Sequence, residues 1–290
     1  MEERLELVKF CHKVYEKGFV SATDGNLSLR LDSKRILITP SGKNKGEVEP
    51  EDLLIIDYFG NKLFGKGKVT TEVKIHLLAY NSRPEVNAVV HCHPVYATAF
   101  ATAGVDLSQP VFPEVILSIG EIPLCRYGTP STDELPDSMK PFINYAWAFL
   151  LQNHGAVTLG VSIEDAYFKM EKLEHAAQTI FIAKILGGVN PLSKENIEKL
   201  LSIAEKTYGV KPKFKLNKFT DGTTGNENRK KNTSQTGTYT EIIENRLKSR
   251  AGNPKVNPFD VKSRLTSDEQ KYQNTINIEE INKIIKEFKF

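Results

Sequence analysis

An apolar run that ends in two histidines, "NAVVHCHP" at residues 87–94, constrains this chain more than any other stretch. The run favours a buried strand, and residues i and i+2 of a strand point to the same face. His91 and His93 can therefore converge on one ion, while Cys92 points the other way. By spacing alone, the pair is compatible with a metal site or with two hydrogen-bonded imidazoles near the end of a strand.

A metal site at this position needs a third ligand, because three imidazoles with one open position form a catalytic zinc site. The chain holds only six histidines. His154 in "QNHGAV" is the best candidate for the third ligand. It lies at a break in a strand pattern, and Gly155 after it permits close approach of the backbone.

The other three histidines are less suited to binding a metal. His12 and His175 lie in the interior of predicted helices, where packing is the simpler interpretation. His76 follows Glu72 by four residues, on the same face of a predicted helix. We expect His76 to pack in the core or to hydrogen-bond to groups that surround the site.

The order of apolar patterns predicts one α/β (α+β) domain in the first part of the chain. Strands are predicted at residues 26–31, 35–39, 52–57, 87–91, 146–154 and 155–160. Helices are predicted at residues 2–17, 70–82, 94–104, 162–186 and 193–208. Several strands are followed by helices, which favours a central, mainly antiparallel sheet flanked by helices.

Composition excludes several classes of protein. The net charge of +3 is too small to indicate a nucleic-acid partner. No apolar run approaches the roughly 18–20 residues that span a membrane, and the acidic, amphipathic start does not resemble a signal peptide. Three cysteines without framework spacing fit free thiols in a reducing cytoplasm. We therefore expect a cytoplasmic protein with no membrane or nucleic-acid partner.

The character of the sequence changes near residue 217. Residues 217–274 are mostly polar and cannot bury enough apolar surface to offset their ordering entropy, so they are interpreted as a flexible linker with a short helix at 239–250. Residues 275–290 have apolar side chains at helical spacing, with acids and lysines opposite, which predicts an amphipathic C-terminal helix.

Five motifs in a fixed order resemble the class II aldolase and adducin family, and within it the zinc-dependent L-fuculose-phosphate aldolases. The motifs are "DGNLSLR" (24–30), "ITPSG" (38–42), "TTEVKIHLLAY" (70–80), "AVVHCHP" (88–94) and "LLQNHGAVTLG" (150–160). The resemblance implies a class II aldolase-like domain of three layers, which we assign to residues 1–216. It also implies one Zn²⁺ per subunit and a homotetramer with active sites at the subunit interfaces.

The resemblance assigns roles to individual residues. It implies that His91, His93 and His154 bind zinc and that Glu72 is the catalytic acid and base. Six further positions match the phosphate- and substrate-binding residues of the family: Gly25, Asn26, Ser41, Gly42, Thr70 and Thr71. Turns that contain glycine and the start of a helix do provide the neutral donors that a phosphate needs. Taken alone, each of these short motifs is more often only a turn, and Thr70 is more simply a helix cap.

The implied reaction is retro-aldol cleavage of a ketose 1-phosphate, similar to L-fuculose 1-phosphate, to dihydroxyacetone phosphate and an aldehyde similar to lactaldehyde. One alternative is an epimerase of the L-ribulose-5-phosphate 4-epimerase kind, although that branch has an aspartate at the position of Glu72. A second alternative is a non-catalytic, adducin-like interaction module, which lacks the metal site.

The sequence departs from the family in one respect. The fuculose aldolases use a tyrosine in the loop after the helix that follows HxH, whereas residues 108–123 contain none. Glu114 or Tyr208 is expected to replace it. The tail at 275–290 resembles the encapsulation peptides that direct enzymes to the shell proteins of bacterial microcompartments. The alternative is a helix that docks on the enzyme itself.

Overall fold

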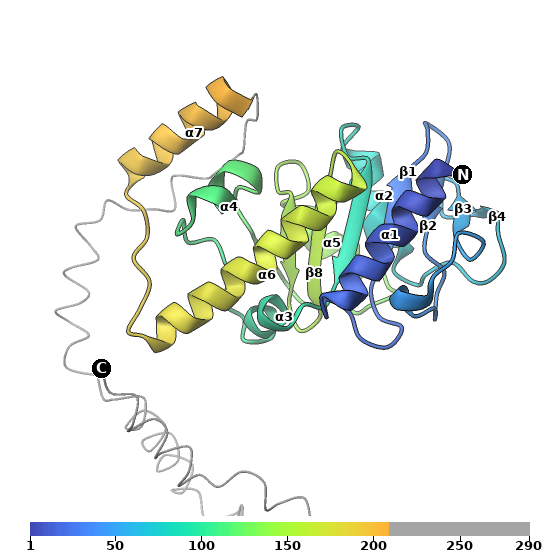
Figure 1. Cartoon of the computed structure of the whole chain (residues 1–290), viewed down its shortest axis with the longest axis horizontal. Coiled ribbons are helices and arrows are strands. Elements are labelled where there is room, and N and C mark those ends of the chain that lie inside the picture. Colours follow the sequence, from blue (N-terminus) through green and yellow to red (C-terminus); the bar gives the residue numbers. More distant parts are fainter. Residues whose placement is uncertain (209–290) are drawn as a thin grey trace, which may run out of the picture. The chain divides into compact units, whose positions relative to one another are not determined.

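The computed structural model describes residues 1–208, which form helices on both sides of one sheet (Figure 1). The helices are α1 (Glu2–Glu16), α2 (Val73–Ser82), α3 (Val95–Thr102), α4 (Pro113–Ser118), α5 (Glu134–Met139), α6 (Ile163–Ile185) and α7 (Lys194–Tyr208), with a short 3-10 helix η1 (Lys45–Glu47). The strands are β1 (Asn26–Arg30), β2 (Ile36–Ile38), β3 (Leu54–Ile56), β4 (Lys62–Phe64), β5 (Ala88–Cys92), β6 (Leu124–Cys125), β7 (Ala148–Leu151) and β8 (Gly155–Gly160).

The strands of this region lie in the order β4-β3-β2-β1-β5-β8-β7-β6. Every neighbouring pair is antiparallel except β6 and β7, which run parallel, so the prediction of a mainly antiparallel sheet is confirmed. β5, which carries the first histidine of the HxH pair, is a central strand between β1 and β8.

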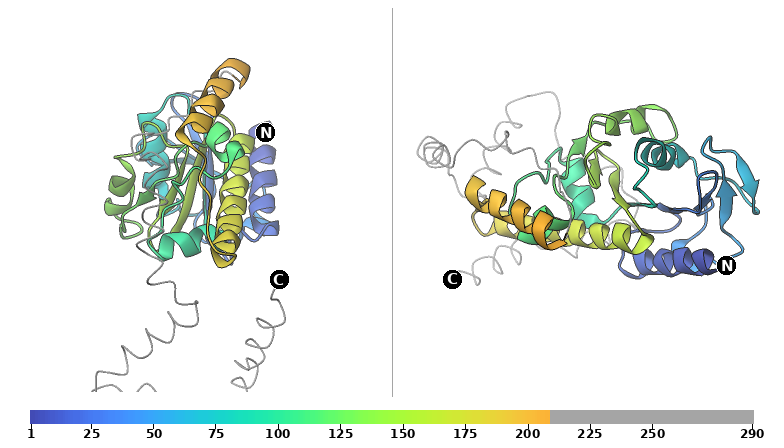
Figure 2. Two further views of the ribbon diagram at one scale, coloured as in Figure 1. Left: turned by 90° about the vertical axis from the view of Figure 1, so that its left-hand side faces the viewer. Right: turned by 90° about the horizontal axis from the view of Figure 1, so that it is seen from above.

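Two hydrophobic cores, one on each face of the sheet, make the fold a three-layer structure. Side chains of α1, α3 and α6 pack against one face, and those of α2 and α5 pack against the other. The ribbons in Figure 2 show helices on both sides of the sheet. β5, β7 and β8 are buried along their whole length. Strands buried on both faces have continuous apolar runs instead of an alternating pattern, as "AVV" and "AFLL" do here.

The short elements were not predicted. β4 and β6 contain only two or three residues, and α4 and α5 only six each, which is too short for a periodic pattern to stand out. α2 begins at Val73 instead of residue 70, because the preceding residues form the turn that leads into it. α6 begins after Ser162, whose hydroxyl accepts a hydrogen bond from the backbone N–H of Asp165.

None of the helices within residues 1–208 has the length and apolar character needed to cross a bilayer. The predicted domain boundary at 216, the linker at 217–274 with its helix at 239–250, and the C-terminal helix at 275–290 lie outside the described residues.

Candidate functional site

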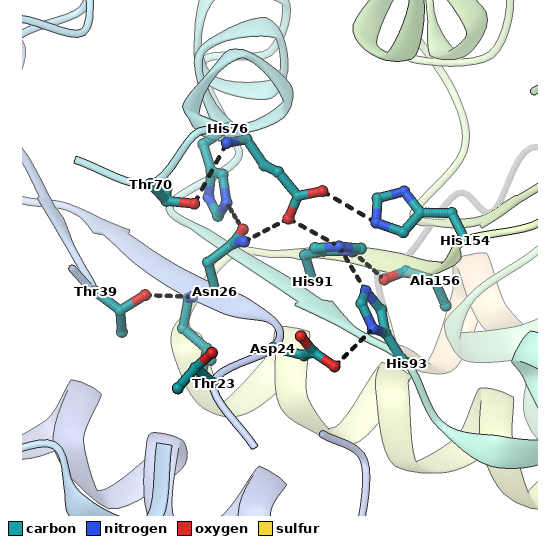
Figure 3. Close-up of polar contacts among 12 residues, drawn as sticks. Thr23, Asp24, Asn26, Thr39, Thr70, His76, His91, His93, His154 and Ala156 are labelled. Carbon is teal, nitrogen blue, oxygen red and sulfur yellow. Dashed lines mark hydrogen bonds and ion pairs between the residues drawn. The ribbon is translucent and has the colours of Figure 1, made fainter. Parts of the chain in front are cut away.

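Three histidines from two parts of the chain converge beside the central strands (Figure 3). His91 is in β5, His93 follows that strand, and His154 lies in the turn between β7 and β8. One ring nitrogen from each lies within 4.8 Å of the others, and the Nε2 atoms of His91 and His93 are 3.2 Å apart. Tetrahedral zinc with Zn–N bonds of about 2.0–2.1 Å separates two ligand nitrogens by about 3.3 Å. The donor atoms and their spacing therefore fit a divalent metal ion.

Backbone geometry brings these imidazoles together. β5 and β8 are antiparallel with Cys92 opposite Ala156, so the turn that carries His154 lies beside the end of β5. A Cβ atom on Gly155 would lie 2.5 Å from Cδ2 of His93, so any side chain here would displace the imidazole or the backbone. Cys92 is fully buried in the core on the α1 and α6 side, so it points away from the site, as alternation along a strand predicts.

The protonation of two of the rings is set by their neighbours. Nδ1 of His91 lies 2.9 Å from the carbonyl oxygen of Ala156, which can only accept, so Nδ1 carries a proton and Nε2 is the nitrogen that a metal would bind. Burial, followed by the neighbouring His91 and His154, lowers the pKa of His93 to about 4. The ring of His93 is therefore neutral near pH 7, the form in which imidazole binds a metal.

Glu72 lies between the metal-ligand candidates and the start of α2. Its Oε1 is 3.0 Å from Nε2 of His154, and its Oε2 is 3.3 Å from Nε2 of His91. Nδ2 of Asn26 donates to the same Oε2 at 2.8 Å. Burial by itself raises the pKa of Glu72, but His91 and His154 outweigh burial and hold the pKa below its ordinary value. Glu72 is therefore a carboxylate that is held in place on both oxygens.

One pocket of about 320 Å³ joins these groups to the predicted phosphate-binding residues. It is lined by Thr23, Asp24, Gly25, Asn26, Pro40, Ser41, Gly42, Thr70, Thr71, Glu72, His93 and His154. Every residue expected to bind the metal or the phosphate lines this pocket, as does Glu72, except His91, which is fully buried beneath it. The loop before β1, the loop after β2 and the N-terminus of α2 therefore meet around one space.

The phosphate-binding candidates have specific local geometry. Gly25 has a φ of +71°, and a Cβ there would lie 2.5 Å from Cγ1 of Val20 and 2.8 Å from the carbonyl oxygen of His91. This position therefore needs glycine both for its backbone conformation and for the close contact. Oγ1 of Thr70 accepts from the backbone N–H of Glu72 at 3.3 Å and so stabilises the turn before α2. The N-cap of α2 is Glu72 and not Thr70, and the Thr70 hydroxyl can still donate.

Sequence reasoning missed two groups near the pocket. Asp24 faces His93, with Oδ2 at 3.8 Å from Nδ1. Lys45 is only 1% exposed, and its ammonium donates to the backbone carbonyls of Thr23 at 3.0 Å and Lys43 at 2.8 Å. Lys45 thereby ties together the two loops that line the pocket. A buried lysine one residue into a short 3-10 helix has no pattern by which the sequence alone would reveal it.

His76 and His12 lie outside the metal cluster. Nε2 of His76 contacts Oδ1 of Asn26 at 2.5 Å, so the predicted hydrogen bond to a group around the site is confirmed. His12 contacts the carbonyl oxygen of Val48, away from the pocket. Glu114 does not line the pocket within this chain, but lines a different groove of about 690 Å³ together with His175. Tyr208 ends α7, and its side chain lies outside the described part of the chain.

Comparison with known proteins agrees with this geometry. Residues 5–181 match the family described as Class II Aldolase and Adducin N-terminal domain. An L-fuculose phosphate aldolase of Methanococcus maripaludis is 38% identical over 177 residues, which are 61% of this chain and 95% of that protein. A 3-oxo-tetronate 4-phosphate decarboxylase of Pectobacterium atrosepticum is 36% identical over 183 residues, which are 62% of this chain and 84% of that protein.

Solved structures show the same fold. YgbL of Escherichia coli matches with a TM-score of 0.64 and 33% identity, over 69% of this chain and 97% of that one. An L-fuculose 1-phosphate aldolase matches with a TM-score of 0.63 and 29% identity, over 71% of this chain and 95% of that one. Since the family match covers more than half of the sequence, this chain belongs to the class II aldolase and adducin N-terminal domain family.

Proposed function

We propose that this chain is a zinc-dependent lyase that cleaves a ketose 1-phosphate of the L-fuculose 1-phosphate kind to dihydroxyacetone phosphate and an aldehyde. One observation carries the proposal. The three imidazoles and Glu72 lie at the same pocket as two glycine-containing loops and the N-terminus of a helix, which together suit a phosphorylated ligand. A site with only a metal, or only an anion-binding loop, would not favour this chemistry.

Different residues would bind the substrate and transfer the proton. Hydroxyl and N–H groups of Ser41, Gly42, Thr70 and Thr71 would hold the phosphate, since all four residues line the pocket. A zinc ion held by His91, His93 and His154 would polarise the substrate ketone and stabilise the negative charge that develops on its oxygen.

Glu72 would then exchange the proton at the carbon beside the ketone. When the C3–C4 bond breaks, its electron pair passes to C3, the C4 hydroxyl loses its proton, and C4 becomes the carbonyl of the aldehyde. C3 must gain a proton to give dihydroxyacetone phosphate. Glu72 is suited to that step because it is mostly buried, contacts two of the imidazoles and has no other acid beside it in the pocket except Asp24.

A second candidate is decarboxylation of a 3-oxo-tetronate 4-phosphate, the reaction in the name of relatives that are 34–36% identical. Such a β-keto acid loses CO₂ and leaves the same three-carbon phosphate fragment. CO₂ departs without a proton transfer at its oxygens, whereas the aldehyde requires one at the C4 hydroxyl. Residues 108–123 contain no tyrosine, and Glu114 lies in a different groove. Neither supplies a proton-transfer group for the aldehyde oxygen, which favours decarboxylation.

One assay tests both candidates. The purified protein is given ketose 1-phosphates, ketose 5-phosphates and 3-oxo-tetronate 4-phosphate, with and without a chelator, and release of dihydroxyacetone phosphate is measured. An aldehyde as co-product identifies the aldolase, and CO₂ identifies the decarboxylase. Conversion of a ketose 5-phosphate to its epimer without cleavage would support the epimerase. No turnover together with no bound metal would support the interaction module.

Assembly and targeting are separate proposals. We propose a homotetramer with active sites at subunit interfaces, and recruitment to microcompartment shell proteins through residues 275–290. The motif order supports the first and the amphipathic pattern of the tail supports the second. Light scattering of the full chain tests the tetramer. Deletion of 275–290 should leave cleavage intact and abolish co-purification with shell proteins, and an encapsulated truncated enzyme would refute the targeting proposal.

A further inference from the structure

We infer that Tyr80, Ser28 and His76 are positioning residues, which form a buried hydrogen-bond chain that orients the amide of Asn26 and so holds Glu72 in place. The inference rests on the role proposed above for Glu72. No part of it requires these three residues to touch the substrate, and none of them lines the pocket.

The chain runs from α2 across β1 and back to Glu72. Figure 3 shows its part from His76 to Asn26. The hydroxyls of Tyr80 and Ser28 are 2.7 Å apart, and Oγ of Ser28 is 2.6 Å from Nδ1 of His76. Nε2 of His76 is 2.5 Å from Oδ1 of Asn26, whose Nδ2 is 2.8 Å from Oε2 of Glu72. Tyr80, Ser28, His76 and Asn26 are each at most 3% exposed, so water does not compete for these hydrogen bonds.

The hydrogen bond from Asn26 to Glu72 fixes the donor and the acceptor of every other hydrogen bond in the chain. The carboxylate of Glu72 can only accept, so the amino group of Asn26 must face it. Oδ1 of Asn26 then faces His76 and also only accepts, so Nε2 of His76 must carry the proton. Burial lowers the pKa of His76 to about 3, so the ring is neutral and its Nδ1 is an acceptor.

The same logic fixes the two hydroxyls. Because Nδ1 of His76 accepts, Ser28 must donate to it, and the oxygen of Ser28 then accepts from Tyr80. Burial raises the pKa of Tyr80, which keeps the phenol protonated as a donor. The chain therefore has one consistent direction, from Tyr80 to Glu72.

Loss of the Ser28 hydroxyl leaves the buried Nδ1 of His76 without a donor and removes one of the two contacts that fix the ring. Asn26 still favours the proton on Nε2, but the ring is then held from one side only. The amide of Asn26 loses a fixed partner, and Glu72 loses part of the support that keeps it between His91 and His154.

A purely structural role predicts a different pattern, in which these hydrogen bonds stabilise the core and have no separate effect on turnover. Thr158 provides the matched control. It is fully buried in β8 of the same sheet, and its hydroxyl donates to the carbonyl oxygen of Ala166 at 2.7 Å, outside this chain of contacts. Ser28→Ala and Thr158→Val each remove one buried hydroxyl with little change in shape.

The kinetic test compares these variants with the substrate that the wild type turns over. We expect Ser28→Ala to lower kcat about 10- to 100-fold, the range found when groups that orient a metal-site ligand are removed, with a smaller change in KM. Tyr80→Phe should lower kcat less, because Ser28 can still donate to His76. His76→Gln retains a donor and should keep more activity than His76→Leu. Equal losses of thermal stability in Ser28→Ala and Thr158→Val, with kcat unchanged in both, would overturn the inference.

A second measurement does not depend on any substrate. The protein is labelled with ¹⁵N-histidine, and the six histidines are resolved by NMR, with the signals of His76 identified by their absence in His76→Gln. We expect a neutral ring with the proton on Nε2 in the wild type, and a changed ¹⁵N shift of Nδ1 in Ser28→Ala because that nitrogen loses its hydrogen bond. A wild-type ring protonated on Nδ1 would refute the chain even in an active enzyme. The expected tautomer in a protein that turns over none of the substrates would refute the proposed function alone.

Discussion

Oε1 of Glu72 lies 3.0 Å from Nε2 of His154, so the expected proton-transfer group and an expected metal ligand are in direct contact. This contact joins residues that are 82 positions apart, at the start of α2 and in the turn after β7. Both residues line the same pocket, so the carboxylate lies beside the imidazole that would hold the metal. The two residues nevertheless have separable roles, which substitution can distinguish.

Replacing Glu72 by glutamine should abolish most turnover without loss of the metal. The glutamine side chain keeps the shape of glutamate but cannot exchange a proton near neutral pH. We expect kcat to fall about 10²- to 10⁴-fold, the usual contribution of a general acid or base. Steady-state kinetics and metal analysis of the same preparation check this. A variant within tenfold of the wild-type kcat would show that another group moves the proton.

Replacing His154 by alanine should remove the metal and the activity together. Nδ1 of His154 is buried and has no hydrogen-bond partner among the described residues, and Nε2 contacts Glu72, so the ring is tied to the site and not to the core. The matched control is His175→Gln on the exposed face of α6, which should keep both metal and activity. Metal content after dialysis is the measurement. Full metal content in His154→Ala would exclude His154 as a ligand.

The close approach of Gly155 to His93 can be tested by adding a methyl group and measuring metal affinity. In Gly155→Ala the new methyl group would lie 2.5 Å from Cδ2 of His93 and 2.6 Å from the carbonyl oxygen of Cys92, which is part of the backbone of β5. The imidazole must therefore move. We expect metal affinity to fall about 10- to 100-fold, as when the surroundings of a metal ligand are disturbed. Isothermal titration with zinc checks this, and an unchanged affinity would mean that the strands separate without moving the ring.

The sequence predicted the long elements and the histidine cluster because both depend on regular patterns. Alternation along a strand places His91 and His93 together, and the motif order brings in Glu72 and His154. The position of Lys45 and the contacts of Ser28 could not be predicted in this way. Their partners are backbone carbonyls and side chains that only the tertiary fold brings near, and no periodicity marks them.

Glu114 shows the limit of assigning a role by position in the sequence alone. It was expected to replace the missing tyrosine, yet within one chain it lines a groove formed with α6 and lies outside the pocket. A short helix, α4, carries it, and the direction of such a helix is set by packing against α6 and α7. In the proposed tetramer a neighbouring subunit would present its own surfaces to the pocket, and the proposed aldolase reaction would then draw its proton donor from that interface.

The buried His76 should make the folded state less stable in acid. Its pKa is about 3 in the folded protein, against about 6.5 for an exposed histidine. Above pH 6.5 the ring is neutral in both states and contributes no pH dependence. Below pH 6.5 the unfolded chain takes up a proton that the native state does not. The free energy of unfolding should therefore fall by about 1.4 kcal/mol per pH unit from this residue alone.

Comparison with His76→Gln isolates this effect, because the variant keeps every other titrating group. His91, whose pKa is raised, acts in the opposite direction, and its contribution largely cancels between the two proteins. Urea unfolding of the metal-free proteins between pH 7 and pH 5 provides the measurement. As the pH falls, the free energy of unfolding should decrease more steeply in the wild type than in His76→Gln. The difference in slope should correspond to the uptake of up to one proton on unfolding. Equal slopes would mean that His76 is protonated in the folded protein, which is incompatible with its accepting a hydrogen bond from Ser28.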